Sequence, residues 1–484
     1  MRASIIDVAI IGSGFGGIAM ARALQRAGRD DFMIFEKADA IGGTWRDNTY
    51  PGAACDVPSH LYSLSDAPNP AWTRLFPAQP EIRAYLERLA APLFAAGRIT
   101  TGFRLARAAW NAADAAWRIE SDGGAVVQAR SLVLALGGLH QPAWPDLAGQ
   151  DAFRGASFHT ARWRHDVALD GKRVALIGSG ASAVQVVPAV IDRVAQLHVF
   201  QRTPSWLMPR TDAAFPPWLR TVFRRAPLSA RLLRGAIFLW LEAIAIGLLR
   251  PRFAFWARAM ARRHLRRQVG DPALRAALTP HYPMGCKRVL VSSTYYPALM
   301  RPNCALVDTP VARIEADGVR LVDGRLVEAD VIVYATGFRP LDVLRDVEVT
   351  GRDGRALADA WRERPTAHLG IGVHGYPNLF CLLGPNTALG HNSVLAMIES
   401  QVRHVIAALQ ARDARGARTI EPTAAAQARF IADLDRRFAG TAWAGGCRSW
   451  YLDAQGRNIA LWVGSVLAYR RATRRPIGDD HVFT

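Results

Sequence analysis

A strand, a glycine-rich turn, a helix and a second strand follow one another twice in this chain of 484 residues. The first copy reads DVAII, then GSGFGG with glycines at 12, 14 and 17, and its second strand ends at Glu36. The second copy reads RVALI, then GSGASA with Gly178, Gly180 and Ala183 at the same spacing. Such glycines allow a tight turn, a close approach of the backbone to a pyrophosphate, and close packing of helix on strand. The sequence therefore predicts an α/β protein with two Rossmann-like dinucleotide sites.

The two copies differ at the end of the second strand. Glu36 can accept hydrogen bonds from a ribose diol, which favours a dinucleotide with a free 2′-hydroxyl such as FAD. The second copy has Gln201, Arg202 and Thr203 there instead. A carboxylate would repel a 2′-phosphate, whereas a guanidinium binds one through charge-assisted hydrogen bonds. We therefore expect FAD at the first turn and NADPH at the second.

Two further apolar strands, SLVLALGG at 131–138 and DVIVYATGF at 330–338, resemble each other. They are expected where the chain crosses between an FAD domain and an inserted NADPH domain. The predicted division is an FAD domain split into 1–145 and 340–484, and an NADPH domain over 146–339. The NADPH domain would carry a helical insert at about 210–285.

The number and spacing of the cysteines limit which redox chemistry the chain can carry out. The five cysteines, at 55, 286, 304, 381 and 447, are scattered and form no CxxC pair. We expect neither a disulfide framework nor a metal site, and a reducing cytoplasm fits. The apolar start of the chain predicts a strand, not a signal peptide. Without a redox cysteine pair, a flavin reduced by NADPH would pass its electrons to O2.

Candidate residues for the space between the cofactors lie in two segments. GGTWRDNTYPGAACD, at 42–56, follows Glu36 closely and should pass the flavin, with Trp45 and Tyr50 beside the ring and Asp56 among apolar residues. Far along the chain, YPMGCKRVLV contains Lys287 and Arg288. We expect Arg288 to be a fixed cation at the flavin and Asp56 to orient it.

These motifs resemble those of the Baeyer–Villiger monooxygenases, class B flavoprotein monooxygenases of the flavin-containing monooxygenase superfamily. FRGASFHTARW matches the family fingerprint FxGxxxHxxxW at Phe153, Gly155, His159 and Trp163. Segment 42–56 matches [AG]GxWxxxx[FY]P[GM]xxxD, and ATGF and GPN are also similar. One departure is Arg164, where the family usually has Pro or Asp after the fingerprint Trp.

The resemblance implies roles for particular residues. Arg288 and Asp56 would be the catalytic pair, and the four fingerprint residues would form a hinge between the domains, with His159 positioning rather than touching substrate. The expected FAD set is Gly12, Gly14, Phe15, Gly17, Glu36, Thr44, Trp45, Asp56 and Tyr62. The expected NADP set is Ser179, Gly180, Ala181, Ser182, Gln185, Arg202, Thr203, Lys287 and Arg288. The loop 386–392 would line the substrate pocket.

The implied activity is the conversion of ketones to esters or lactones through a C4a-peroxyflavin, with small apolar ketones as substrates. The alternative is oxygenation of sulfur or nitrogen, as in flavin-containing monooxygenases. A second alternative is a non-catalytic flavin-binding interaction protein. Trp163, Asp56 and Arg288 favour ketone chemistry.

The charge is concentrated in one segment. The net charge is +19, and residues 220–270 contain twelve arginines and one acid, Glu242, which leaves +11. No nucleic-acid-binding motif is present, so we expect no nucleic acid partner. Residues 235–249 are apolar but too few for a confident membrane span. The segment is either a helical lid packed on the NADPH domain, which we favour, or a peripheral contact with an anionic membrane.

Overall fold

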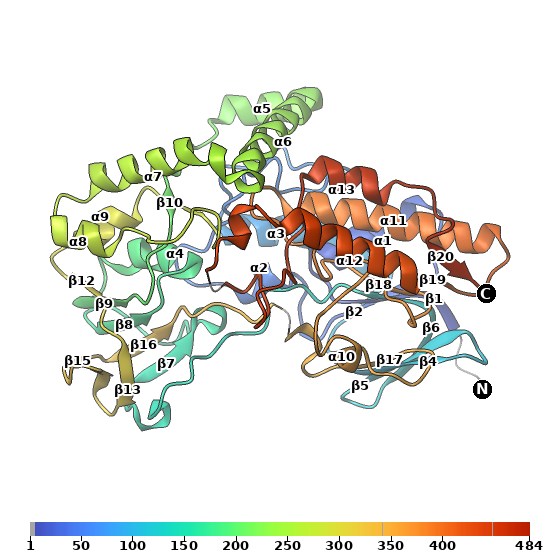
Figure 1. Cartoon of the computed structure of the whole chain (residues 1–484), viewed down its shortest axis with the longest axis horizontal. Helices are drawn as coiled ribbons and strands as arrows, with labels where there is room; N and C mark the ends of the chain where they lie inside the picture. The colour runs from blue at the N-terminus through green and yellow to red at the C-terminus, as the bar shows by residue number, and fades with distance from the viewer. Residues whose placement is uncertain (1–4, 341, 448) are drawn as a thin grey trace.

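The computed structural model describes residues 5–340, 342–447 and 449–484, leaving aside the side chain of residue 248. Two sheets with largely parallel strands lie side by side, one in each half of the molecule (Figure 1). Helices cover both halves, and a group of helices from the middle of the chain projects at the upper edge (Figure 1). Segments from both ends of the sequence share the right-hand half.

The larger sheet takes strands from residues 5–134 and again from 348–381. Its order is β17 (Glu348–Thr350), β4 (Leu105–Asn111), β5 (Ala116–Ser121), β6 (Val126–Leu134), β1 (Ile5–Ile11), β2 (Phe32–Phe35) and β3 (Ile99–Thr100), with β18 (Leu379–Cys381) on β6. The strands β6, β1, β2 and β3 are parallel, as expected for a βαβ unit whose sheet is buried on both faces.

The second sheet is parallel throughout and comes entirely from residues 156–334. Its order is β12 (Cys304–Val307), β9 (Gln196–Phe200), β8 (Arg173–Ile177), β16 (Val331–Tyr334) and β7 (Ala156–His159). Smaller sheets pair β13 (Val311–Glu315), β14 (Gly318–Leu321) and β15 (Leu326–Glu328), then β10 (Leu207–Met208) with β11 (Leu290–Val291), and β19 (Ile420–Pro422) with β20 (His481–Phe483).

The helices divide between the two halves and the projecting group. In the larger-sheet half are α1 (Phe15–Arg26), α2 (Thr44–Asp47), α3 (Gln79–Ala95), α10 (Leu357–Ala360), α11 (Val394–Ala414), α12 (Ala424–Phe438) and α13 (Val466–Thr473). In the other half are α4 (Ala181–Val190) and α9 (Tyr295–Leu299), and the helices of segment 210–285 are α5 (Pro217–Arg225), α6 (Pro227–Leu249), α7 (Phe255–Gln268) and α8 (Pro272–Ala277). Short 3-10 turns are η1 (Gln150–Ala152), η2 (Thr160–Arg162), η3 (Pro251–Phe253), η4 (Asp342–Leu344) and η5 (Ala442–Ala444).

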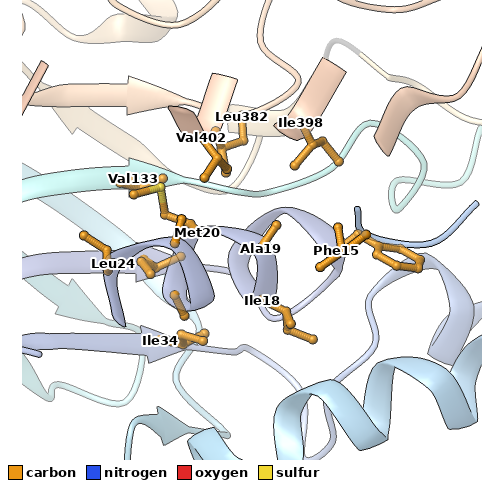
Figure 2. Close-up of a cluster of buried hydrophobic side chains, with 14 of the residues drawn as sticks. Phe15, Ile18, Ala19, Met20, Leu24, Ile34, Val133, Leu382, Ile398 and Val402 are labelled. Carbon is orange, nitrogen blue, oxygen red and sulfur yellow. The ribbon is translucent and has the colours of Figure 1, made fainter. Parts of the chain in front are cut away.

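The core of the larger half holds the first glycine turn in place. Figure 2 shows α1 packed between two layers, with Met20 and Leu24 facing Val133 of β6 and Ile34 of β2. Ile398 and Val402 of α11 lie on the same side of α1 as Val133, opposite Ile34. Because α1 is buried along most of its length, its N-terminus cannot shift relative to the sheet edge.

The segment 210–285 is helical, as its sequence predicts. Of the described helices, none is both long enough and apolar enough to cross a bilayer. Phe238 is buried against the protein body, whereas its neighbours Leu239 and Trp240 are 62% and 58% exposed. The expected lid on the NADPH domain is wrong for α6, which packs on the larger-sheet half in one core with residues of α11 and α13, whereas Leu265 of α7 packs in the core of the other half. The other face of α6 leaves large apolar side chains in solvent.

Candidate active site

A cavity of about 1310 Å³ lies between the two halves and contains both glycine turns. Except for Gly17, all residues of the expected FAD set line it, and so do all residues of the NADP set. Gly17 packs instead inside the turn, where a Cβ would lie 1.9 Å from the Gly12 carbonyl oxygen. The four fingerprint residues are outside the lining.

The two turns have the same backbone geometry. Gly12 and Gly178 have φ angles of 106° and 121°, which side chains rarely tolerate. A Cβ on Gly12 would lie 2.5 Å from the Ala135 carbonyl oxygen, and a Cβ on Gly178 would lie 2.3 Å from that of Ala335. Each glycine thus packs against the end of the strand that crosses to the other half.

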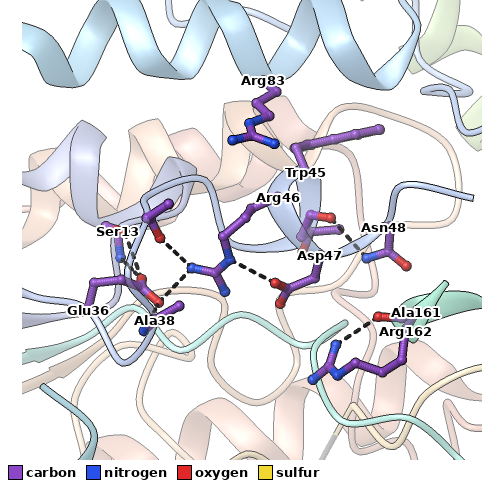
Figure 3. A network of polar contacts seen from close by, with 12 residues as sticks. Ser13, Glu36, Ala38, Trp45, Arg46, Asp47, Asn48, Arg83, Ala161 and Arg162 are labelled. Atoms are coloured by element: carbon purple, nitrogen blue, oxygen red, sulfur yellow. Dashed lines mark hydrogen bonds and ion pairs between the residues drawn. The ribbon is translucent and has the colours of Figure 1, made fainter. Parts of the chain in front are cut away.

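Hydrogen bonds within the chain hold the Glu36 carboxylate in a fixed position (Figure 3). Its Oε2 accepts hydrogen bonds from the backbone N–H and hydroxyl of Ser13, at 2.9 and 2.7 Å, and its Oε1 accepts from Arg46 at 2.8 Å. Burial alone would raise the pKa of Glu36, but these hydrogen bonds hold it below the ordinary value. The side chain is therefore ionised and fixed at the place where a ribose would lie.

Aromatic rings form one wall beside the first turn. The Trp45 indole N–H donates to the Tyr62 hydroxyl at 3.0 Å, and the two rings meet edge to face. Phe15 contacts the other side of Tyr62, with ring centroids 5.3 Å apart. Thr44 begins the short helix α2 that carries Trp45. These contacts fix flat surfaces that suit a planar ring system.

The second turn is open where a phosphate would approach. A Cβ on Gly180 would meet nothing within 4 Å, and the backbone there precedes the first residues of α4. The Ser179 hydroxyl donates to the Thr203 carbonyl at 3.2 Å, which ties the turn to the end of β9. The N-terminus of α4 offers free N–H groups and a partial positive charge to an anion.

Two cations face this open turn. Arg202 and Lys287 make no ion pair with any residue in the described part of the chain. Burial and the nearby charge of Arg202 both lower the pKa of Lys287, so the two side chains are close enough to repel each other. A dianionic 2′-phosphate between them would relieve that repulsion. The residues at both turns thus fit the dinucleotides that the sequence predicts.

Asp56 and Arg288 meet in the cavity, although 232 positions separate them in sequence. The Arg288 Nε and Nη2 donate to one oxygen of Asp56 at 3.1 and 2.6 Å. The charge of Asp56 raises the pKa of Arg288 further. Their side chains are 27% and 39% exposed, so the pair is open toward the cavity. Asp56 holds one edge of the guanidinium and leaves Nη1 without a partner among the described residues.

Gln185 of α4 joins the two halves beside this pair. Its amide oxygen accepts from the Tyr50 hydroxyl at 2.9 Å, and its amide nitrogen donates to the Ala54 carbonyl at 2.9 Å. Gly52 is also pressed against α4, since a Cβ there would lie 2.4 Å from the Gln185 carbonyl oxygen. The segment 42–56 is therefore anchored by the other half of the molecule.

Tyr451 is a cavity residue that the sequence did not single out. It is 1% exposed, its hydroxyl has no hydrogen-bond partner among the described residues, and its neighbours include Arg288 and Asp56. Burial raises its pKa, which keeps the phenol neutral. No motif marks this position, because the C-terminal segment reaches the cavity only through tertiary packing.

The expectation of no disulfide was wrong. Cys286 and Cys447 are disulfide-bonded across 161 residues, with their Cα atoms 6.1 Å apart. The bond joins the loop that carries Arg288 to the loop that precedes Tyr451. Cysteines so far apart in sequence give no local pairing signal. Cys55, Cys304 and Cys381 are free, and the described residues contain no cluster of metal ligands.

His159 lies under the two chain crossings between the halves. Its ring contacts Trp144 and Phe338, with centroids 5.6 and 5.9 Å away. The crossings also bind each other: the Ala143 N–H donates to the Gly337 carbonyl at 2.9 Å, and the Thr336 hydroxyl donates to the Ala143 carbonyl at 2.6 Å. Burial lowers the pKa of His159 to about 4. Its Nδ1 accepts from the Ala161 N–H, so the proton of this neutral ring is on Nε2.

The other fingerprint residues pack around the same strand. A Cβ on Gly155 would lie 2.3 Å from the Asp330 carbonyl oxygen and 2.7 Å from the Phe153 ring. Trp163 meets Phe158 edge to face, at the margin of the second core. Arg164 is exposed and pairs with Asp166, so its departure from the family pattern leaves the buried contacts unchanged.

The loop 386–392 reaches the cavity only in part. Thr387, Ala388, Leu389 and Asn392 line it. The Asn386 amide instead donates to the Asn458 carbonyl at 3.1 Å, and its backbone is left-handed with φ 59°. Trp450 also lines the cavity, and its ring centroid lies 4.5 Å from that of Tyr451, a neighbour of Arg288.

Comparison with known proteins agrees with this geometry. Residues 10–78 match a family described as NAD(P)-binding Rossmann-like domain, and residues 125–246 match one described as flavin-binding monooxygenase-like. A Baeyer–Villiger monooxygenase of Pseudomonas aeruginosa is 44% identical over 97% of this chain and 89% of its own length.

Solved structures agree as well. An oxidised steroid monooxygenase bound to NADP is 31% identical, with a TM-score of 0.89 and 99% of each chain covered. OTEMO in complex with FAD and NADP is 27% identical, with a TM-score of 0.89 and 100% of each chain covered. The predicted α/β fold with Rossmann-like binding units and the predicted cofactors FAD and NADP(H) are confirmed. With an ion pair between two dinucleotide turns, and near-complete alignment to such an enzyme, the chain belongs to the Baeyer–Villiger monooxygenase family.

Proposed function

We propose that the protein uses NADPH, FAD and O2 to convert small apolar ketones to esters or lactones. The observation that carries this proposal is the Asp56–Arg288 ion pair, which opens into the cavity shared by both glycine turns. Bound FAD supplies the oxygen-transfer chemistry and NADPH supplies the reducing equivalents. The residues of the chain bind the cofactors, orient the substrate and stabilise the negative charge that develops during the reaction.

Arg288 is the catalytic cation. Oxygen insertion next to a carbonyl passes through an adduct in which negative charge collects on the former carbonyl oxygen. A preorganised cation stabilises that charge as it develops, and it works best when it is already fixed before the reaction. Asp56 positions Arg288 by holding its Nε and Nη2, and Nη1 remains for the substrate.

The remaining residues hold the cofactors and the hinge. We assign the FAD set and the NADP set to the two dinucleotides, with Arg202 and Lys287 on the 2′-phosphate. We assign Phe153, Gly155, His159 and Trp163 to the hinge, because His159 contacts both chain crossings. The domain boundaries follow these crossings, at 145/146 and 339/340, with the insert at about 210–285.

Apolar and aromatic side chains of the cavity support an apolar ketone as substrate. Leu389, Trp450 and Tyr451 line the cavity. Such surroundings favour burial of a hydrocarbon skeleton and expose its carbonyl to one fixed cation. We also propose that the enzyme touches the membrane only peripherally, through residues 220–270.

The test is product analysis with the purified holoenzyme on a panel of ketones and sulfides. We expect NADPH-dependent ester or lactone formation, which Arg288→Ala should reduce by about 10²–10³-fold while FAD stays bound. Arg301→Ala is the matched control, because Arg301 forms a surface ion pair with Asp192 at 2.7 Å. Sulfoxide without ester would favour the heteroatom oxygenase. No NADPH oxidation would favour the flavin-binding interaction protein.

A further inference from the structure

The outer face of the helical insert carries an unusual combination of side chains. On α6, Leu228 is 65% exposed, Leu232 66%, Leu239 62% and Ile246 52%. They are spaced four and seven residues apart, which places them on one side of an α-helix. We call the exposed side chains of α5, α6, η3 and α7 the insert face. Scattered apolar residues are normal on a protein surface, but a continuous apolar face marks an interaction site.

The insert face also bears strong, uncompensated positive charge. Between Asp212 and Asp271 the one acidic residue is Glu242. Ten arginines of this segment are exposed, and none of them forms an ion pair with another residue that the structure describes. Two exposed tryptophans, Trp218 on α5 (66%) and Trp256 on α7 (71%), lie on the helices next to α6.

The opposite side of α6 is already packed against the protein, so the insert face remains exposed to solvent. Ile237, Phe238 and Leu241 are buried in one core with residues of α11 and α13. Glu242 accepts hydrogen bonds from the Asn392 amide at 2.8 Å and from the backbone N–H groups of Val466 and Leu467, each at 3.1 Å. Burial would raise the pKa of Glu242, but these hydrogen bonds and His391 lower it to about 2.

We infer that the insert face docks on an anionic lipid bilayer. Aliphatic and tryptophan side chains would enter the interface, and the surrounding arginines would bind the lipid phosphates. A second copy of the chain fits less well, because a symmetric dimer through this face would bring arginines against arginines. In Figure 1, α5 and α6 project from the upper edge of the molecule, above the other labelled elements. The inference rests on the proposed peripheral contact and is independent of the ketone chemistry.

The experiment is co-sedimentation of the holoenzyme with vesicles of phosphatidylcholine, with and without phosphatidylglycerol. We expect binding that needs the anionic lipid and weakens with salt, since the Debye length shortens to about 3 Å at 1 M. The double variant Leu239→Ser/Trp240→Ser should weaken binding roughly tenfold or more, because two large apolar side chains lose their burial. Its thermal stability and its turnover of a water-soluble ketone should be unchanged, since both side chains are already in solvent.

A matched control distinguishes binding through the insert face from nonspecific binding through exposed apolar side chains elsewhere. Phe94→Ser/Val322→Ser removes two side chains that are 44% and 62% exposed but lie outside the insert. Val322 is in the turn between β14 and β15, and the sheet of these strands lies at the lower left of Figure 1, away from α5 and α6 at the upper edge. This variant should bind vesicles normally. Phe238→Ser, in contrast, should lower thermal stability, because Phe238 is buried with the Arg470 guanidinium over its ring.

The other possible outcomes of this experiment would each contradict a different part of the inference. No sedimentation with any vesicle would refute the peripheral contact itself. Equal binding with or without phosphatidylglycerol would show that the arginines do not bind lipid phosphates. An unaffected Leu239→Ser/Trp240→Ser variant would place the membrane contact on another face. A dimer in lipid-free buffer that the same variant abolishes would make a second copy the occupant.

Discussion

The two glycine turns have one backbone and two different charge arrangements. Gly12 and Gly178 adopt similar φ angles and press against equivalent strand ends. After the second strand, however, Glu36 is held by Ser13 and Arg46 within the chain. Arg202 and Lys287 instead face the cavity and form no ion pair within the part of the chain that the structure describes. The turn thus provides for a dinucleotide of either kind, and we propose that the residue after the second strand selects which one.

The first turn should be the more sensitive to a change of charge. Glu36→Lys would place a cation beside Arg46 and remove the acceptor for the ribose diol. We expect the variant to lose nearly all bound FAD, measured as flavin absorbance per chain after purification. Glu87→Lys is the control, because Glu87 makes an exposed helical ion pair with Arg83. A Glu36→Lys protein with a full complement of FAD would refute the assignment of this turn.

At the second turn, two glycine substitutions distinguish a role in packing from a role in ligand binding. Gly178→Ala would force a Cβ to 2.3 Å from a backbone oxygen, so we expect little folded protein. Gly180→Ala meets no protein atom within 4 Å and should fold normally. Its new methyl group would occupy the approach of the phosphate, so we expect KM for NADPH to rise roughly tenfold with FAD content unchanged. If Gly180→Ala left that KM unaltered, the pyrophosphate would lie elsewhere.

An effect that depends on pH should appear where the two halves join. The pKa of His159 falls from 6.5 to about 4 on folding, so the folded state binds fewer protons between these values. Stability should therefore decrease as pH falls from 6.5 to 4, by up to about 3 kcal/mol from this residue.

His159→Gln should flatten this part of the stability profile, measured by thermal denaturation across pH. The exposed His165→Gln should not. An unchanged slope in His159→Gln would show that other buried histidines account for the acid sensitivity.

Some features of the fold and of the site could be predicted from short stretches of sequence, and others could not. The strands, turns and strand-end residues of both dinucleotide units are encoded within some thirty consecutive positions, so the sequence predicts them. No short stretch of sequence shows that Asp56 meets Arg288, because 232 positions separate them, and the motif match supported that pairing. Neither Tyr451 nor the Cys286–Cys447 bond has a local signal, since both arise when the C-terminal loops fold over the cavity. Periodicity alone also could not show that α6 is apolar on its solvent side as well as its buried side.

The comparison of the two turns is tested most directly by kcat/KM for NADPH and NADH, in the unmodified enzyme and in Arg202→Ala. We expect the unmodified enzyme to prefer NADPH by about 10²-fold, because two cations would bind the 2′-phosphate through charge-assisted hydrogen bonds. Arg202→Ala should lower the NADPH value roughly tenfold and leave the NADH value unchanged. Equal kcat/KM for the two nicotinamides in the unmodified enzyme would contradict the account.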